Sequence, residues 1–596
     1  MSKLISKLSQ KIILVTRHNL FPYLLVIVLS IPAFSFFLKP GVYWNMHDDM
    51  QMIRQLEFEK CIFDGQIPCR WTPDLGYGYG YPLFNFYPPL PYIIGQVFRS
   101  FSFDFMTTVK LTAALQFVLA VVFMYLLVSS VFGRLGGILS ALFYTYAPYH
   151  ALNVYIRGAM NEAWASVFFP LIFYFSRKLI LEKKIKYTLW LALSFSFLLL
   201  SHNPMVMTFT PILLVWCLFW ILTQYNKKNS FLINLSKSKS IFFKLFLSGI
   251  FALCLSAFFT LPVLFETKYV SVETMFTGYY HFSAHFASIL QLFFSNFWGD
   301  GGSIWGPNDG MSFMIGYLHW IVPILVAIGS LVYLIKTKKI NYKISISLIF
   351  VAIGFFAAFM SHERSTFLWL LITPIQKVQF PWRFLNHSVF AFSFAVGVLP
   401  FLLQNLFKLK SSVIKILISL LILILFFLNK NYFYPIHSGP ITDDQKFSGL
   451  SWQNQITASI YDYLPKTAKI AAQGPAKDFI DEIFPSDSIY QISNAKKGTD
   501  WQSFNLHLNS PATVTLPILS FPKFKVFDNT SEINYTVDPQ LGRIKLDLST
   551  GNHQIFVRLY NTPIRTISNY LSLFSWLLVL FFTVKTIRWK KNPGKK

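Results

Sequence analysis

The sequence predicts a polytopic α-helical membrane protein that carries a small extracytoplasmic β-sandwich domain before its last membrane span. Three observations lead to this prediction. Of the 596 residues, 54% are hydrophobic and only 13% are charged, whereas soluble domains carry roughly 25% charged residues. Apolar runs of about 20 residues, the length of a transmembrane helix, recur along the chain. A region near the C-terminus instead alternates polar and apolar residues over short segments, as β-strands do.

The apolar runs predict about twelve membrane spans, because each run is long enough to cross a bilayer as a helix. The spans lie at roughly residues 20–38, 107–131, 135–150, 162–177, 187–201, 204–223, 245–265, 311–335, 343–360, 386–405, 412–429 and 567–587. An even number of spans places both ends of the chain on the same side of the membrane.

The net charge of +26 is distributed as a membrane topology requires. Lysine and arginine gather at both termini and in alternate connections between spans, including residues 177–186, 227–244, 336–343 and 408–415. Because cytoplasmic loops carry this excess, we expect a multi-pass protein of the plasma (cytoplasmic) membrane with both termini cytoplasmic. Nucleic-acid binding, the competing explanation for the positive charge, is disfavoured because the basic residues do not gather in one domain.

This topology divides the chain into three consecutive parts. Residues 1–429 form a transmembrane module with a long first outer loop at 39–106, residues 430–566 form the β-rich domain, and residues 567–596 form the last helix and a basic cytoplasmic tail. Alternating segments predict strands at 512–516, 523–528, 543–548 and 553–559. Since the inner loops are short, we expect function in the outer loops.

Two adjacent acids, Asp48 and Asp49, follow His47 about ten residues after the first span. Charged residues are costly beside a bilayer, so they are candidates for function by default. A carboxylate here could act as a general base on an acceptor hydroxyl, or the pair could bind Mg²⁺ or Mn²⁺. The alternative is that the acids cap the start of a short helix, where the helix dipole favours negative charge.

The rest of the first outer loop is rich in glycine, proline and aromatic residues. Residues 76–92 fit either an aromatic belt at the membrane surface or an aromatic-lined groove near the acids, since flat rings suit a sugar or a lipid tail. Cys61 and Cys69 lie close together in the same loop. They could pair in an oxidising compartment or remain free thiols, and the sequence leaves both open.

Arg157 and Glu162 flank the start of the fourth span, where they could form a site or simply pair with each other. His202 and Asn203 mark another outer turn, in which His202 is either a polar turn residue or a reacting group. His281 and His285 have the i, i+4 spacing of a helical metal pair, without the glutamate of an HExxH motif.

The third outer loop, residues 361–385, carries cations on the side of the membrane where the chain has few. Arg364, Lys377 and Arg383 therefore need a reason other than topology, and the loop also holds Gln379 and Trp382. The phosphate or pyrophosphate of a membrane lipid is a natural partner for an arginine fork. Contact with anionic lipid headgroups is the alternative.

Several segments resemble a known group of membrane proteins over nearly the whole chain. They are His47-Asp-Asp49, the run GYGYPLFNFYPPLPY at 78–92, YIRGAMNEAWA at 155–165, SHNP at 201–204, QFPWRF at 379–384, and the β-domain followed by Thr562-Pro-Ile-Arg-Thr. These features resemble glycosyltransferases of the GT-C class. More closely they resemble the membrane proteins labelled "6-pyruvoyl-tetrahydropterin synthase-related", and distantly the YfhO-like proteins. The pterin label is a misnomer here, because neither a histidine zinc cluster nor a compact α/β domain is present.

The resemblance implies inverting transfer of a sugar from a polyprenyl-phosphate carrier to a glycan, lipid or protein acceptor outside the membrane. It implies a catalytic role for Asp48, Asp49 and Glu162, with the two aspartates as base or metal ligands. Other residues would bind the substrate, in a site surrounded by membrane lipids; they are His47, Arg157, His202, Asn203, Lys377, Gln379, Trp382 and Arg383.

Two other functions are open at this point. A transporter or flippase for a lipid-linked glycan would need charged residues deep within several spans, and the sequence has few. A non-catalytic envelope assembly protein would depend on the β-domain, residues 430–566, and would tolerate the loss of Asp48 and Asp49.

Overall fold

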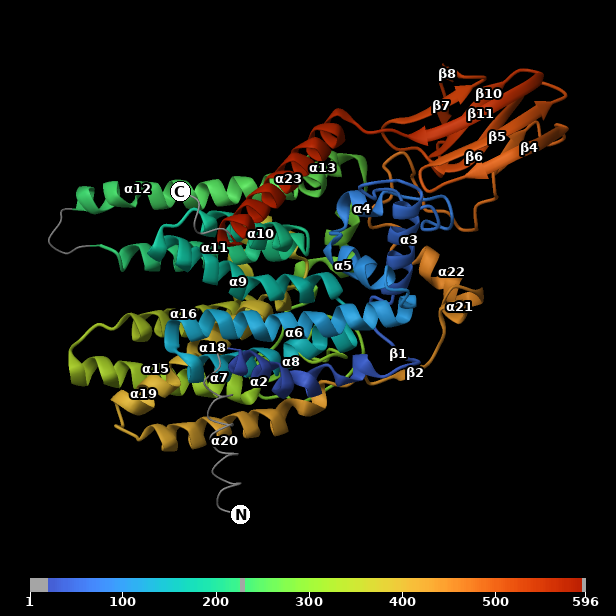
Figure 1. The fold of residues 1–596 in the computed structure, drawn as a ribbon. Coiled ribbons are helices and arrows are strands. Elements are labelled where there is room, and N and C mark those ends of the chain that lie inside the picture. The colour runs from blue at the N-terminus through green and yellow to red at the C-terminus, as the bar shows by residue number, and fades with distance from the viewer. Residues whose placement is uncertain (1–19, 226–230, 592–596) are drawn as a thin grey trace, which may run out of the picture. The chain divides into compact units, whose positions relative to one another are not determined.

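The computed structural model describes residues 20–225 and 231–591 (Figure 1). The chain divides into two compact units, each built from separate stretches of sequence. Unit 1 comprises residues 1–48, 110–249 and 279–440, and unit 2 comprises 49–109, 250–278 and 441–596. This division differs from the three consecutive parts predicted from the sequence. Several of the basic residues predicted to be cytoplasmic lie outside the described residues: Lys3, Lys7, Lys11, Arg17, Lys227, Lys228, Lys595 and Lys596.

Unit 1 is helical, and its long helices run side by side in Figure 1. Helix α9 packs against α10 and α11, while α18 packs against α7 and α16. Their bounds, with those of the neighbouring helices, are α2 Phe21–Ser30, α6 Phe105–Phe132, α7 Arg134–Thr145, α9 Met160–Glu182, α10 Lys186–Leu199, α11 Asn203–Leu222, α12 Phe231–Leu255, α15 Tyr317–Thr337, α16 Tyr342–Met360, α18 Leu385–Ala395, α19 Leu399–Asn405 and α20 Ser411–Asn429.

Within residues 20–225 and 231–591, nine helices are long and apolar enough to cross a membrane. They identify a multi-pass membrane protein, as the composition predicts. Three of the predicted spans fall on shorter helices, because α2, α7 and α10 have 10, 12 and 14 residues, below the roughly 20 that span a bilayer. The count of twelve spans therefore stays a prediction.

Unit 2 combines residues 49–106 of the first outer loop, the helix pair α13 and α23, and the β-domain. A buried ion pair links the two helices: Arg565 Nε donates to Glu266 at 2.8 Å. Arg70 of the first outer loop donates to Asn85, which in turn donates to Glu266. The helices of this unit are α3 Gln51–Phe63, α4 Leu83–Phe86, α5 Leu90–Arg99, α13 Ala257–Glu266, α21 Asp443–Lys446, α22 Gly449–Thr457 and α23 Pro563–Lys591.

The β-domain consists of two antiparallel sheets whose inner faces share one hydrophobic core. The first sheet has the strand order β3-β6-β10-β9 and the second β4-β5-β11-β7-β8. Alternate residues along β5 and β11 face this core, as a half-buried strand requires. The four predicted strands are confirmed as β6, β7, β10 and β11. The bounds are β3 Glu482–Phe484, β4 Tyr490–Lys497, β5 Trp501–Leu508, β6 Ala512–Leu519, β7 Phe524–Asp528, β8 Ser531–Ile533, β9 Thr536–Val537, β10 Arg543–Leu548 and β11 Gly551–Leu559.

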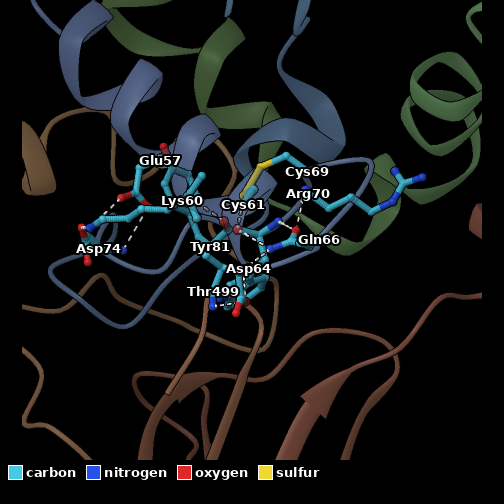
Figure 2. The surroundings of a disulfide bond; sticks show 12 residues. Glu57, Lys60, Cys61, Asp64, Gln66, Cys69, Arg70, Asp74, Tyr81 and Thr499 are labelled. Atoms are coloured by element: carbon cyan, nitrogen blue, oxygen red, sulfur yellow. Dashed lines mark hydrogen bonds and ion pairs between the residues drawn. A yellow bond between two sulfur atoms is a disulfide. The ribbon is translucent and has the colours of Figure 1, made fainter. Parts of the chain in front are cut away.

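The glycine- and aromatic-rich part of the first outer loop belongs to the core of unit 2. Tyr79, Tyr81 and Phe86 are buried in the same hydrophobic cluster as the β-strands. Neither an aromatic belt at the membrane surface nor an open groove describes these three side chains, because packing against the β-domain covers them. Cys61 and Cys69 form a disulfide in this loop (Figure 2), which resolves the alternative that the sequence left open.

Candidate functional site

A buried carboxylate in unit 1, that of Glu162, accepts four hydrogen bonds. Its Oε1 accepts from the Tyr149 hydroxyl at 2.9 Å and from the Asn386 amide at 2.7 Å. Its Oε2 accepts from Arg157 at 2.9 Å and from Arg383 Nε at 3.1 Å. Glu162 lies in the first turn of α9, where the helix dipole favours a negative charge. Four donors use the acceptor capacity of a carboxylate fully.

The two arginines come from different parts of the sequence and are held by further contacts. Arg157 donates to Asn153, and its guanidinium lies over the Trp382 ring at 4.3 Å from the centroid. Arg383 donates to the Val378 carbonyl at 2.7 Å and to Gln379 Oε1 at 3.2 Å. Arginine planes stack on aromatic rings in this way. The guanidiniums are therefore fixed in place as well as paired.

The side chains of Arg157, Glu162 and Arg383, counted by themselves, carry one positive charge in excess, because two guanidiniums share one carboxylate. All three side chains are at least 88% buried. An excess buried charge is costly unless a counter-ion compensates it. The three predicted residues that meet here thus form a cluster suited to an anion.

The His47–Asp48 segment lies along the backbone that leads into Arg157. The His47 amide donates to the Ile156 carbonyl at 2.9 Å, and the Asp48 amide donates to the Arg157 carbonyl at 3.0 Å. Gly158 permits this approach, because it has φ +63° and a Cβ there would collide with Met46. The structure therefore places the backbone of His47 and Asp48 beside the segment that carries Arg157, and their role in a site stays a prediction.

Two histidines of the predicted site lie near the cluster and are uncharged at neutral pH. His202 caps α11, where its Nδ1 accepts from the Met205 amide, and burial together with the charge of Arg383 lowers its pKa to about 3. His47 contacts the Asp300 carbonyl at 2.9 Å, and burial lowers its pKa. Neither imidazole therefore adds to the positive charge of the cluster.

Asp49 belongs to unit 2, where the buried ammonium of Lys446 contacts its carboxylate. Helix α3 begins at Gln51 with Met50 at its N-cap and without a side-chain capping bond. The interpretation of the acids as helix caps is therefore wrong. Asp48 and Asp49 are adjacent in sequence but contact different residues: Asp48 contacts Arg157 in unit 1, and Asp49 contacts Lys446 in unit 2.

The remaining predicted residues differ in position. Trp382 is buried beneath Arg157 and its Nε1 donates to Ser303 at 3.3 Å. Asn203 begins α11 next to His202. Lys377 is exposed at the end of a short helix, and no contact with another described residue places it in the cluster.

The predicted histidine metal pair is not formed. His281 and His285 flank a 3-10 helix, Phe282–Ala284, instead of lying on one face of an α-helix. Both ring nitrogens of His285 have partners, Ser303 Oγ at 2.9 Å and the Tyr279 carbonyl at 2.6 Å. The i, i+4 spacing was misleading because the chain turns more tightly here than an α-helix.

Among the residues that the structure describes, no three His, Cys, Asp or Glu side chains gather closely enough to bind a metal ion. Magnesium sites can rest on one or two carboxylates and substrate phosphates. The predicted Mg²⁺ or Mn²⁺ at Asp48 and Asp49 therefore stays a prediction.

Sequence reasoning missed two of the donors to Glu162, Tyr149 and Asn386. Both lie in apolar stretches that the sequence predicts to be membrane helices. A polar residue within such a stretch is a candidate for function, and this could have identified them. It also missed the π-helical turn Leu152–Ile156 that precedes Arg157. Such turns are rare in proteins overall, but those that occur often lie at functional sites. No sequence pattern predicts them.

Comparisons with known proteins give weak matches. No family model matches the chain. It is 25% identical over 258 residues to an uncharacterised protein of Lactococcus lactis subsp. cremoris, covering 42% of this chain and 41% of that protein. The chain thus spans less than half the length of this relative. The resemblance to the pterin synthase-related and YfhO-like proteins stays a prediction.

Two solved structures share a partial likeness. The arabinofuranosyltransferase AftD from Mycobacteria matches 70% of this chain and 28% of its own, with a TM-score of 0.41 and 11% identity. The oligosaccharyltransferase of Archaeoglobus fulgidus matches 77% of this chain and 60% of its own, with a TM-score of 0.45 and 14% identity. Both scores are below 0.5, so the function has to be argued from the site.

Proposed function

We propose that this protein is a membrane glycosyltransferase of the GT-C type. It moves a sugar from a polyprenyl-phosphate carrier to an acceptor hydroxyl outside the cytoplasm, with inversion at the anomeric carbon. The observation that carries the proposal is the buried Arg157–Glu162–Arg383 cluster with its excess positive charge. A lipid-linked sugar supplies the anion that such a cluster needs, namely the phosphate that joins the sugar to the lipid.

Asp48 is proposed as the general base. Its carboxylate takes the proton of the acceptor hydroxyl as that oxygen bonds to the anomeric carbon. The bond between the anomeric carbon and the phosphate oxygen breaks, and polyprenyl phosphate leaves with the electron pair. Arg157 and Arg383 stabilise the charge that develops on the leaving phosphate, which is how fixed cations lower a barrier. No step passes through a metal.

Glu162 is proposed as a positioning residue. Its two oxygens already accept four hydrogen bonds, so taking up a proton would break contacts that hold both arginines. Asp48 is the better candidate for the base, because the backbone of Asp48 is bonded to the arginine segment. Asp49 instead stabilises unit 2 through Lys446.

The orientation of the protein is proposed from two observations. The first outer loop holds the Cys61–Cys69 disulfide, and disulfides persist in oxidising compartments outside the cytoplasm. Lysines follow the ends of α9 and α15, at residues 183–186 and 336–339, where the positive-inside rule places the cytoplasm. Both support cytoplasmic termini in the plasma membrane.

The test is to incubate the purified full-length protein with a panel of polyprenyl-phosphate sugars and to follow consumption of the carrier. Asp48→Asn should lower the turnover rate by about 10²–10⁴-fold, the usual contribution of a general base. Arg383→Gln should raise KM for the carrier about ten- to hundredfold, since a charge-assisted hydrogen bond contributes about 1.5–3 kcal/mol.

The control is Asp444→Asn, which removes an exposed carboxylate from α21 and should leave turnover unchanged. Asp49→Asn should lower stability more than turnover. Normal turnover by Asp48→Asn would show that another residue is the general base. Normal turnover by both Asp48→Asn and Asp49→Asn would contradict the proposed mechanism. Carrier movement across vesicles without consumption would favour the flippase.

A further inference from the structure

Unit 2 contains a cavity of about 570 Å³ between the first outer loop and the β-domain, within the size range of small-ligand sites. The loop contributes Trp71 and Tyr79, and the β-domain contributes Phe524 and the Asp500–Gln502 segment at the start of β5. The cavity therefore combines aromatic rings with polar side chains. Neither the arginine cluster of unit 1 nor any residue proposed for catalysis belongs to it.

The walls of the cavity are joined by a fixed set of hydrogen bonds. Asp64 of the loop accepts from the Thr499 amide at 2.6 Å, from the Thr499 hydroxyl at 2.7 Å and from Trp501 Nε1 at 3.2 Å. Gln66 donates to the Thr499 hydroxyl at 2.9 Å (Figure 2). Gly498 is required at this joint, because a Cβ there would collide with Asp64 and Trp501. The cavity is thus built into the fold.

Two buried polar atoms of the lining lack hydrogen-bond partners among the described residues. Gln502 is 3% exposed, and its Nε2 is a donor without an acceptor. Asp500 is 9% exposed, and its Oδ1 is an acceptor without a donor, with Arg558 Nε at 3.9 Å. Leaving such groups unpaired costs free energy. Both residues belong to the lining of the same cavity.

The charges around the cavity are already compensated within the protein. Lys60 pairs with Asp74, and Lys497 pairs with Asp478 at 3.1 Å. Asp64 has its three hydrogen bonds to the β-domain. The lining holds three lysines, with Lys477 as the third, and four aspartates, which include Asp500. An anionic ligand such as a phosphate therefore finds no net positive charge here. The cavity suits an uncharged ligand.

We infer that this cavity binds an uncharged sugar unit of a glycan. A sugar hydroxyl can donate to Asp500 and accept from Gln502, which satisfies both unpaired atoms. The apolar face of a sugar ring can pack on Phe63 of the loop or on Trp501 of β5, two lining rings that are less buried than Trp71, Tyr79 and Phe524, since aromatic rings offer large flat apolar surfaces. The inference goes beyond the proposed function, because binding needs neither the arginine cluster nor turnover.

The experiment measures binding of soluble, uncharged oligosaccharides of glucose, galactose, mannose and rhamnose to the full-length protein by isothermal titration. At least one should bind, and Gln502→Leu should weaken its Kd about tenfold or more, because the ligand hydroxyl then loses its donor. Asp500→Asn should also weaken binding. The matched control is Gln491→Leu, an exposed glutamine on β4, which should bind as the wild type does.

Thermal unfolding separates a binding role from a structural one. Because Gln502 Nε2 has no partner among the described residues, leucine should leave the unfolding temperature unchanged or raise it while binding falls. Absence of binding by every oligosaccharide at millimolar concentration would overturn the inference. Equal affinity of Gln502→Leu and the wild type would also overturn it, as would stronger binding of an unrelated peptide. Failure of sugar transfer with intact binding would affect only the proposed function.

Discussion

Replacing Glu162 by glutamine tests whether this carboxylate holds the arginine cluster together. The carboxylate accepts from Arg157 and Arg383 on one oxygen and from Tyr149 and Asn386 on the other. A glutamine side chain has one accepting oxygen and one donating amide. If its NH₂ group faces the arginines, it meets two obligate donors; if it faces the other way, it meets the Asn386 amide, while the Tyr149 hydroxyl can rotate and accept. Glu162→Gln therefore removes the charge and breaks one or two hydrogen bonds.

The expected loss of stability follows from these contacts. If the NH₂ faces the arginines, two charge-assisted bonds of about 1.5–3 kcal/mol each are lost, which gives about 3–6 kcal/mol. Removing one partner of a buried ion pair costs a similar amount, about 3–5 kcal/mol. Glu162 is 1% exposed, so solvent gives little compensation. The two arginines would then repel each other without a counter-charge.

The assay is denaturant or thermal unfolding of the purified protein, followed by circular dichroism. The control is Glu182→Gln on the same helix, where the carboxylate pairs with Lys178 and is 28% exposed. That variant should lose less than about 1 kcal/mol, because exposed pairs contribute little. Equal stability losses in Glu162→Gln and Glu182→Gln, or no loss in either, would refute the assignment of Glu162 as the residue that anchors the cluster.

Three further predictions concern unit 2. Burial raises the pKa of Asp500 from 3.8 to about 6, so its contribution to stability is complete below about pH 4 and is lost as pH rises through 6. The loss is about 3 kcal/mol, and Asp500→Asn should remove this pH dependence from unfolding curves. Cys61→Ser should lower the free energy of unfolding by about 2.5 kcal/mol, because the disulfide no longer closes its short loop. A reductant should then have no further effect on the unfolding of this variant. Gly80→Ala should lower the free energy of unfolding by about 1–3 kcal/mol, because φ is +71° and the added Cβ would collide with Trp71. The control is Gly474→Ala, where the added Cβ meets open space, and this variant should unfold as the wild type does.

Much of the fold could be predicted because hydrophobic periodicity depends on local sequence alone. The long apolar runs form helices, and four alternating segments form strands of the β-domain. Strand β4 was missed because nearly all of its side chains are exposed, so its sequence, residues 490–497, shows no alternation. The assembly of units from separate stretches could not be predicted, since it depends on contacts between residues far apart in the chain.

The candidate site was predictable where a residue breaks a rule of its surroundings. Arg383 is a cation in a connection predicted to lie on the side where cations are few, and Glu162 is an acid at the edge of an apolar helix; the structure brings the two together at 3.1 Å. Asp48 and Asp49 break the same rule, yet the sequence could not separate them. Only the backbone bond to Arg157 and the ion pair with Lys446 assign them to different surroundings.

The cavity of unit 2 also contains a residue that breaks the pattern of its surroundings. Along β5 the inward positions after Gln502 are Phe504, Leu506 and Leu508, all buried and apolar. Glutamine at the first inward position breaks this pattern, and among the described residues its Nε2 finds no acceptor for a hydrogen bond. Proteins violate local rules chiefly at functional sites, where a ligand supplies the missing contact. Arg383 in unit 1 and Gln502 in unit 2 are such violations of opposite kind, an excess charge and an unpaired neutral donor. We therefore propose different ligands for them, an anionic carrier for the first and an uncharged sugar for the second.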